Sequence, residues 1–363
     1  MDFFPNLFGF QESGYLMTQE KLLQTAIFRE MPLEHYFREQ CDFHLPGRRM
    51  VTAGIFSMPS IMELRESADG LLNKNECNIR VQNMKGESRS LHSNNTKINK
   101  TGAPVVIQAA SQFNLLEFSS ASECPESGIS GYVFDHTQGP ACAVACAAGT
   151  AYRKYLVPVP FPKRCKQEPG RRGQTKQHQL NGLADVEEYL LRETSLGECP
   201  WTVTNGYIES SRAKLAELNQ LLSSPGNDLY DHMISRIRIG VQEDTAVTDD
   251  RSLNTKVTQT YNSAISIGYS SLPVALWKPV AQVVLDATYE ATLLVGVLQS
   301  RSGAPPPTVF LTKVGGGVFG NDGAWIRQAM ARAIRKVETY GVPLDIRIVH
   351  YGSIEQEYKE LER

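Results

Sequence analysis

Two short, continuous apolar runs limit the folds open to this chain more than any other feature. Residues 103–110 (APVVIQAA) and 308–312 (TVFLT) are rich in β-branched residues and are bounded by polar or small residues. Such runs are typical of strands buried on both faces of a sheet. Residues 280–298 and 325–340 instead repeat apolar side chains at helical spacing. Strands that alternate with helices predict an α/β fold, with a central sheet and helices on both of its faces.

The remaining segments predict an extension and an insertion around this sheet. Apolar residues recur at helical spacing in residues 18–40, so we expect residues 1–50 to form a mostly helical N-terminal extension. Residues 51–363 are then the main domain. Within it, residues 159–181 are basic and rich in Pro and Gly, which predicts a long loop. This loop is either a solvated insertion or a contact for an anionic partner.

Composition excludes several classes of protein. The 363 residues carry 37 Lys and Arg against 39 Asp and Glu, and a net charge of −2 argues against a globally basic nucleic-acid binder. No stretch approaches the ~18 uninterrupted apolar residues of a membrane span. The start, MDFFPNLFGF, lacks a basic region before an apolar run, so no secretory signal is expected. Seven cysteines without CxxC pairs favour a reduced protein of the cytoplasm or nucleus, with no metal site.

Three segments near the predicted strands carry turn or anion-binding chemistry. They are residues 109–117 (AASQFNLLE), 135–143 (DHTQGPACA) and 315–322 (GGGVFGND). The last two open helices, where free N–H groups and the helix dipole favour a phosphate and glycines permit close approach. One such loop is an ordinary tight turn, but two at strand ends predict a diphosphate held between them. Neither is a Walker A or GxGxxG motif, which favours a nucleoside-diphosphate ligand over ATP hydrolysis or hydride transfer.

The order of these segments resembles the macrodomain superfamily of ADP-ribose binders, and the resemblance implies a mixed central sheet with helices on both faces. Longer strings are similar to its MavL-like branch of arginine-specific ADP-ribosylhydrolases, and they cover most of the chain from about residue 56 to residue 352. Lys154 is a departure, because the branch is expected to have Asn there. Poly(ADP-ribose) glycohydrolases carry Gln-Glu-Glu after their three glycines, and its absence here argues against cleavage of poly(ADP-ribose) chains. The strings are YVFDHTQGPACAVACAAGTAYRKYL, the GQ and QLN of residues 173–181, VVLDATYEATLL and VFLTKVGGGVFGN.

The resemblance implies a set of residues that contact ADP-ribose. In the superfamily, an Asn after the central strand lies near the distal ribose, and two loops hold the diphosphate. Phe319 either covers the ligand or packs beneath its own loop. The implied binding residues are Gln112, Phe113 and Asn114 after the strand; Asp135, Gln138, Gly139, Pro140, Ala141 and Cys142 in the first loop; and Gly315, Gly316, Gly317, Val318, Phe319, Gly320 and Asn321 in the second.

Three carboxylates are candidates for catalysis. Breaking the N-glycosidic bond to arginine passes through an oxocarbenium-like transition state, which a carboxylate stabilises while it activates water. Asp286 and Glu290 stand four residues apart on one face of an otherwise apolar helix, and mutual repulsion should raise the pKa of one of them. Glu117 lies just beyond the first segment. The alternatives are structural: Asp286 and Glu290 solvated or bridged to Arg or Lys, Glu117 satisfied by neighbours, and Asp135 capping a turn.

These residues and the resemblance lead to one expected function with two alternatives. We expect a hydrolase that removes mono-ADP-ribose from arginine side chains of modified proteins, with ubiquitin as one candidate substrate. No cofactor, metal, membrane or specific nucleic acid is expected. The first alternative is a reader that binds ADP-ribose without cleaving it. The second is a hydrolase of small ADP-ribose derivatives, although a basic insertion fits a protein substrate better.

Overall fold

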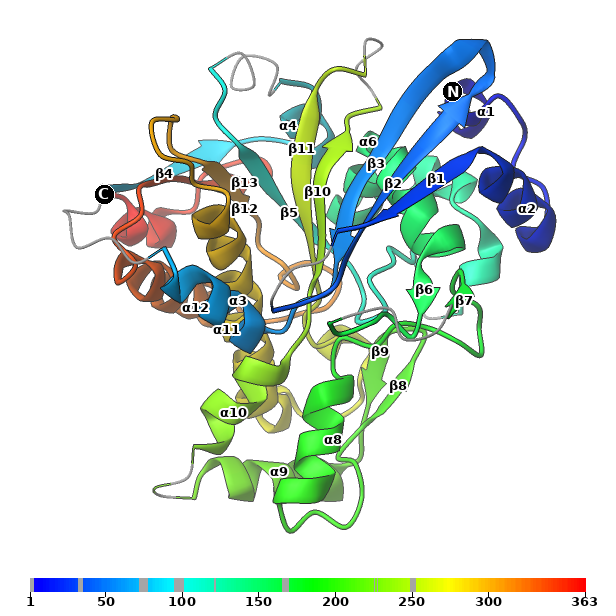
Figure 1. Ribbon diagram of the computed structural model, residues 1–363. Coiled ribbons are helices and arrows are strands. Elements are labelled where there is room, and N and C mark those ends of the chain that lie inside the picture. Colours follow the sequence, from blue (N-terminus) through cyan, green and yellow to red (C-terminus); the bar gives the residue numbers. More distant parts are fainter. Residues whose placement is uncertain are drawn as a thin grey trace.

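A nine-stranded mixed sheet forms the centre of the molecule in the computed structural model (Figure 1). The structure describes residues 3–31, 35–71, 78–94, 101–120, 122–164, 170–224, 226, 228–248 and 253–363. Strands β11, β5, β12, β13 and β4 are parallel, and β1, β2, β3 and β10 continue the sheet in antiparallel fashion. In sheet order the strands are β1 (Ala26–Glu30), β2 (Arg38–Leu45), β3 (Arg49–Ser57), β10 (Gly240–Ala246), β11 (Lys256–Asn262), β5 (Val105–Ala110), β12 (Thr308–Leu311), β13 (Leu344–His350) and β4 (Ile79–Lys85).

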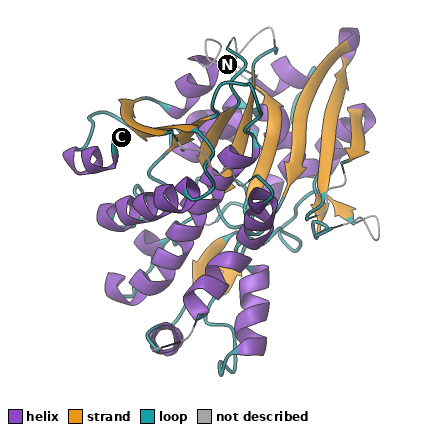
Figure 2. Cartoon of the chain, turned by 60° about the vertical axis from the view of Figure 1, so that its left-hand side comes forward, coloured by secondary structure: helices purple, strands orange, loops and turns teal. Residues whose placement is uncertain are grey.

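Helices cover both faces of this sheet (Figure 2), which confirms the predicted fold class and both predicted buried strands, β5 and β12. Alternate residues of a strand point to opposite faces. Ala109 and Tyr261 therefore pack with α6 and α7, whereas Gln108 lies on the other face and donates to Thr292 of α11. The helices are α1 (Phe3–Phe8), α2 (Tyr15–Thr25), α3 (Ile61–Asp69), α4 (Ser88–Asn94), α6 (Gln138–Ala145), α7 (Ala147–Ala151), α8 (Ala184–Glu193), α9 (Arg212–Leu222), α10 (Leu229–Arg236), α11 (Val274–Leu298) and α12 (Gly323–Glu338).

Helix α11 is the core helix of one sheet face. By length and composition, this helix of 25 residues could cross a membrane. However, 94% of its most apolar 18-residue stretch is buried inside the fold. The helix packs against α3, α9, α10 and α12 as well as against the sheet. A helix that is apolar nearly all round is buried by neighbours on most of its sides, and α11 follows that rule.

An inserted unit lies at the edge of the sheet where β5 ends. Helices α8, α9 and α10 and the hairpin of β8 (Thr202–Thr204) and β9 (Tyr207–Glu209) form it, and Figure 1 shows them below the sheet. Two backbone hydrogen bonds join the unit to the loop after β5: Gly182 N donates to the Phe113 carbonyl, and Phe113 N donates to the Gly206 carbonyl. The insertion is therefore held against the carboxyl end of the central strand.

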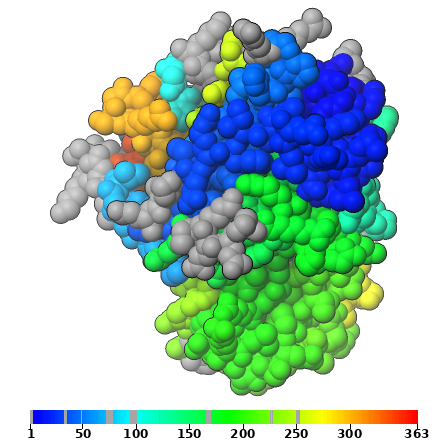
Figure 3. All heavy atoms as spheres, turned by 45° about the vertical axis from the view of Figure 1, so that its right-hand side comes forward, coloured from blue at the N-terminus to red at the C-terminus, as the bar shows by residue number. Residues whose placement is uncertain are grey.

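The N-terminal region differs from the predicted helical extension. Helix α2 ends at Thr25, and β1 and β2 follow where the periodicity of residues 18–40 predicts a helix. Strand β3 crosses the expected boundary at residue 50 and pairs with β2 and β10. Pairing of the backbone with neighbouring strands, together with burial of the apolar residues of β2, outweighs a weak helical period. In Figure 3 the blue N-terminal residues lie directly against the green middle of the chain.

The basic insertion is only partly described. Strands β6 (Pro158–Val159) and β7 (Arg171–Arg172) pair at its base, while residues 165–169 lie outside the described residues. Two of the cysteines, Cys77 and Cys165, also lie outside the described residues. The structure confirms Cys142 and Cys146 as small buried residues.

Candidate active site

Three loops meet at the carboxyl ends of the parallel strands. We call residues 111–118 after β5 the strand-end loop, residues 135–139 the α6 loop and residues 315–321 the glycine loop. The glycine loop rests on the loop that follows β11, because Gly268 N donates to the Phe319 carbonyl and the Asn321 amide donates to Ile265 and Gly315 carbonyls. In open α/β sheets, ligands bind at this edge.

The α6 loop is fastened to the end of β5. The Gln138 side chain accepts a hydrogen bond from Ala110 N at 2.5 Å and donates to the Gln108 carbonyl at 2.7 Å. Gly139 is needed here, because a Cβ at that position would lie 2.4 Å from the Ala110 carbonyl oxygen. Asp135 accepts from the backbone N and the hydroxyl of Thr137, which is the turn-capping role named as its alternative. These contacts place the start of α6 over the end of β5.

Glycines shape the second of the two predicted phosphate-binding loops. Gly315 and Gly320 adopt positive φ angles of 80° and 69°, which other residues rarely take. Asp322 caps α12 by accepting from Ala324 N. A Cβ added at Gly317 would meet no other part of the chain within 4 Å, so the backbone there faces open space. The loop therefore offers exposed backbone near a helix start, as a phosphate site requires.

The predicted distal-ribose residues have their amides engaged within the protein. Gln112 donates to the Phe118 carbonyl and the Tyr207 hydroxyl and accepts from Phe118 N. Asn114 donates to Gln179 at 2.7 Å and accepts from Leu116 N. Both residues are buried and hold the strand-end loop in shape. Their contact with a ribose stays a prediction.

The Phe319 ring packs against two other aromatic rings. Its ring lies 5.7 Å from that of Tyr207 and 6.1 Å from that of Tyr269, measured between centroids. Tyr207 comes from the inserted hairpin and Tyr269 from the loop after β11, so three separate segments meet at Phe319. The neighbouring Val318 is 62% exposed. Packing beneath the loop, one of the two roles expected for Phe319, is therefore observed.

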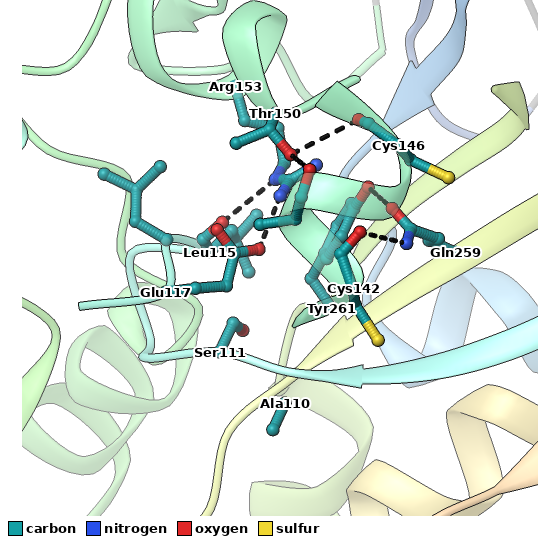
Figure 4. Close-up of polar contacts among 12 residues, drawn as sticks. Ala110, Ser111, Leu115, Glu117, Cys142, Cys146, Thr150, Arg153, Gln259 and Tyr261 are labelled. Atoms are coloured by element: carbon teal, nitrogen blue, oxygen red, sulfur yellow. Dashed lines mark hydrogen bonds and ion pairs between the residues drawn. The ribbon is translucent and has the colours of Figure 1, made fainter. Parts of the chain in front are cut away.

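Glu117, in the strand-end loop, forms a buried ion pair (Figure 4). Its Oε1 accepts from Arg153 Nη2 at 2.5 Å, and both side chains are fully buried. Its Oε2 has no hydrogen-bond partner among the described residues. The Glu117 side chain lies beside Gly139, whose added Cβ would sit 3.3 Å from Glu117 Cγ. A buried carboxylate with one unpaired oxygen thus adjoins the α6 loop.

Burial and nearby cations act on Glu117 in opposite directions. Removal from water raises the pKa of Glu117, while the charge of Arg153 and then that of Lys154 pull it down. Burial also lowers the pKa of Lys154, from 10.5 to about 8. The Lys154 ammonium donates to the Gly128 carbonyl and lies 4.9 Å from the centroid of the Tyr132 ring. The net effect is a raised pKa for Glu117, as a proton-transfer group requires.

Asp286 and Glu290 belong to a different cluster. Glu290 pairs with Arg65 at 2.5 Å and with Arg332 at 2.7 Å, and Asp286 accepts from Tyr230 and Gln282. Burial alone would raise the pKa of Glu290, but these two arginines hold it below its usual value. Asp286 has a raised pKa, chiefly from burial. The two pKa values diverge as expected, but the main causes are burial at Asp286 and the two arginines beside Glu290, and repulsion between the carboxylates contributes less.

The structure does not bring this pair together with Glu117. Asp286 and Glu290 lie on the side of α11 that faces α3, α10 and α12, through Arg65, Tyr230 and Arg332. Thr288 and Thr292, on the opposite side of α11, contact Ser263 and Thr260 at the sheet. Arg153, which holds Glu117, stacks on Tyr261 on the other face of that sheet. The bridged alternative named for the pair is the arrangement observed, and its catalytic role stays a prediction.

Sequence reasoning missed Arg153 and Tyr261. A usable signal was present, because Arg153 lies in a segment of buried residues, where a cation needs a buried anion. Which anion it meets depends on the tertiary fold. Among the described residues, no group of three or more His, Cys, Asp or Glu side chains is placed to hold a metal ion.

Comparisons with known proteins give only remote likeness. No family model matches the chain, and no curated protein matches it. Among solved structures, poly(ADP-ribose) glycohydrolase from Thermomonospora curvata is 11% identical, with 96% of this chain and 95% of that chain covered and a TM-score of 0.42. The enzyme from Deinococcus radiodurans in complex with ADP-ribose is 8% identical, with 84% and 90% covered and a TM-score of 0.39. Likeness at this level carries no activity over to this chain.

Proposed function

We propose that this protein is a hydrolase that removes mono-ADP-ribose from arginine side chains of modified proteins. One observation carries the proposal: the strand-end loop, the α6 loop and the glycine loop meet at one edge of the sheet, with an incompletely paired carboxylate among them. The MavL-like strings in the sequence support the same ligand and the same linkage.

The two glycine-containing loops suit the diphosphate of ADP-ribose. The α6 loop offers a helix start at the end of β5, and the glycine loop offers exposed backbone at Gly317. Both have small residues where backbone must come close to a ligand, and helix starts favour negative charge. A diphosphate between them would direct the distal ribose toward the strand-end loop.

Glu117 is the carboxylate that we assign to the chemistry. Its unpaired Oε2 is the atom available to a reacting group, while Arg153 holds Oε1. In its ionised form Glu117 would stabilise positive charge at the ribose C1 and accept a proton from attacking water. With a raised pKa, a protonated fraction would instead donate to the departing guanidine. In either case the bond from C1 to the arginine nitrogen breaks. The hydroxyl of the water molecule joins C1, and a proton joins the arginine nitrogen.

A reader of ADP-ribose is the second candidate, and the same carboxylate favours it. The Glu117 side chain is fully buried, so a substrate reaches Oε2 only after the surrounding loops move. A reader needs no such contact, because the diphosphate loops alone supply its affinity.

Binding is tested with a charge placed in the glycine loop. Gly317→Glu adds a side chain into open space, so the fold should be retained, while its carboxylate repels a diphosphate. We expect calorimetry to show ADP-ribose affinity weaker by about 10-fold or more. Gly197→Glu is the matched control, since Gly197 also has open space and lies beyond α8, outside these loops. Equal affinity in both variants would show that the glycine loop binds no phosphate.

Turnover is tested with arginine-, serine- and glutamate-linked ADP-ribosylated substrates. The hydrolase proposal expects release of ADP-ribose from the arginine linkage and a loss of about 100-fold or more in Glu117→Gln. Binding without release from any linkage would establish the reader. Release that survives in Glu117→Gln would return Asp286 and Glu290 to consideration.

A further inference from the structure

Arg153 is held in one orientation by three contacts. Its Nε donates to the Leu115 carbonyl at 3.1 Å, and its Nη2 donates to Glu117 at 2.5 Å. Its guanidinium carbon lies 3.4 Å from the centroid of the Tyr261 ring. A guanidinium is planar, so stacking on a ring face fixes the plane in which its N–H groups point. Figure 4 shows Glu117 and Tyr261 beside the side chain of Arg153.

The ring of Tyr261 is packed in a buried apolar cluster, and its hydroxyl joins a buried chain of hydrogen bonds. The Tyr261 hydroxyl donates to Gln259 Oε1 at 2.7 Å, and Gln259 Nε2 donates to the Cys142 carbonyl at 3.0 Å. Gln259 Nε2 also lies 2.8 Å from His92 Nε2, and His92 Nδ1 lies 2.6 Å from the Ser88 carbonyl. Tyr261, Gln259 and His92 are all buried.

The direction of each bond in this chain follows from its neighbours. An amide nitrogen only donates, so His92 Nε2 must accept and Nδ1 must carry the proton toward the carbonyl of Ser88. The amide oxygen of Gln259 then faces Tyr261 and accepts from its hydroxyl. The hydrogen bonds thus run from His92 on α4 to Gln259 and Tyr261 on β11, with a branch from Gln259 to the Cys142 carbonyl on α6.

We propose that Tyr261 is a positioning residue for Glu117, acting through Arg153, on whose guanidinium its ring face stacks. The inference rests on the proposed function in assigning the chemistry to Glu117. Without the ring face, Arg153 would lose one of its three constraints and its hold on Oε1 would weaken. We therefore predict that loss of the ring changes the pKa of Glu117 and the turnover of the enzyme. The affinity of the diphosphate-binding loops for ADP-ribose should not change.

Two substitutions separate the ring face from the hydroxyl. Tyr261→Leu removes the ring, and Tyr261→Phe keeps the ring and removes only the bond to Gln259. We expect Tyr261→Leu to lower kcat for ADP-ribosyl-arginine by about 10-fold or more, with KM and ADP-ribose Kd within about 3-fold of the unmodified protein. Tyr261→Phe should restore kcat to within about 3-fold of that protein. Tyr358→Leu, which truncates another buried tyrosine near the C-terminus, controls for general loss of packing.

A second readout does not depend on turnover. Arg153 holds the pKa of Glu117 down against burial, so loosening Arg153 should shift the titration of Glu117 to higher pH by about half a unit or more. Carbon-13 NMR of labelled glutamate carboxyls, assigned with Glu117→Gln, measures this shift. Tyr261→Leu should show it, and Tyr261→Phe and Tyr358→Leu should not. If Tyr261→Leu does not fold, Arg153→Lys replaces it, because an ammonium keeps the charge and loses the planar stacking.

The outcomes distinguish the two proposals. An unchanged Glu117 titration in the folded Tyr261→Leu or Arg153→Lys variant overturns the positioning role. Equal losses in Tyr261→Leu and Tyr358→Leu, or a parallel loss of ADP-ribose affinity, do the same. If the unmodified protein cleaves no linkage but the titration shifts as expected, the positioning role stands and the hydrolase proposal fails.

Discussion

At the scale of single residues, the buried charges of this protein differ in how completely they are paired. Glu290 is paired with both Arg65 and Arg332, whereas Glu117 forms one ion pair, and its Oε2 has no hydrogen-bond partner in the described part of the chain. A fully paired carboxylate has little capacity left for a substrate, while a half-paired one has an open acceptor. This difference is why we assign the chemistry to Glu117 and a structural role to Glu290.

Glu290→Gln should therefore lower stability and spare turnover. The neutral amide leaves Arg65 and Arg332 partly buried without their anion, and loss of one member of a buried pair costs roughly 3–5 kcal/mol. Since Arg65 and Arg332 retain 22% and 28% exposure, water offsets part of this, and we expect about 1–3 kcal/mol. Chemical denaturation measures the change. A variant of normal stability that releases no ADP-ribose would instead place Glu290 in catalysis.

Lys154 gives a prediction for alkaline pH. Its pKa is lowered from 10.5 to about 8 in the folded protein, chiefly by burial. Between these values the unfolded chain binds more protons at this site, so stability rises with pH over that window. We expect the unmodified protein to gain about 1–3 kcal/mol relative to Lys154→Met between pH 8 and pH 10.5. Parallel curves for the two proteins across that range would mean that Lys154 titrates normally.

At the scale of elements, the glycine loop depends on both conformation and space. Gly315 has a φ of 80°, and a Cβ there would lie 2.4 Å from Ala264 Cβ on the loop after β11. Gly317 has neither constraint. The glycine loop therefore contains glycines required by its backbone, Gly315 and Gly320, and Gly317, whose exposed backbone we assign to the ligand.

Gly315→Ala should destabilise the protein where Gly317→Ala does not. The positive φ and the contact with Ala264 together should cost about 1–3 kcal/mol. Thermal unfolding of both variants without ligand measures this, and ADP-ribose titration of Gly317→Ala follows. Equal melting temperatures would show that the loop adjusts to a side chain at either position.

At the scale of the whole molecule, the N-terminal segment is tied to the candidate site. Glu12 accepts from Ile129 N at 2.8 Å, from Ser130 N at 2.7 Å and from the Tyr155 hydroxyl at 2.5 Å. These partners precede the α6 loop or follow α7 in the chain. One carboxylate near the N-terminus thus holds together segments that lie more than 100 residues away.

Glu12→Ala should therefore affect both stability and ligand binding. Two partly buried N–H donors and a hydroxyl lose their acceptor, which costs about 1–3 kcal/mol. The segment leading into the α6 loop is then less ordered, and we expect ADP-ribose affinity to fall by about 3-fold or more. Glu20→Ala, an exposed position on α2, is the control. Stability loss with unchanged affinity would confine Glu12 to a structural role.

Local pattern alone determined several parts of this protein. The apolar runs predicted β5 and β12, the helical periods predicted α11 and α12, and the fold class followed from their alternation. These features depend on the hydrophobic periodicity of neighbouring residues, which can be read directly from the sequence. The loops after the strands were likewise found at the sheet edge, because parallel strands bring their carboxyl ends to the same side.

The tertiary structure alone decided which charges meet. Glu117 finds Arg153 at 36 residues' distance along the chain, and Glu290 finds Arg65 at 225 and Arg332 at 42. The four-residue spacing of Asp286 and Glu290 correctly put them on one helix face, but it did not say what that face meets. The strands β1 and β2 were missed for a related reason, since a strand is stabilised by a partner across the sheet. A buried charge needs an opposite charge within a few ångströms, and folding, not sequence spacing, brings that partner to it.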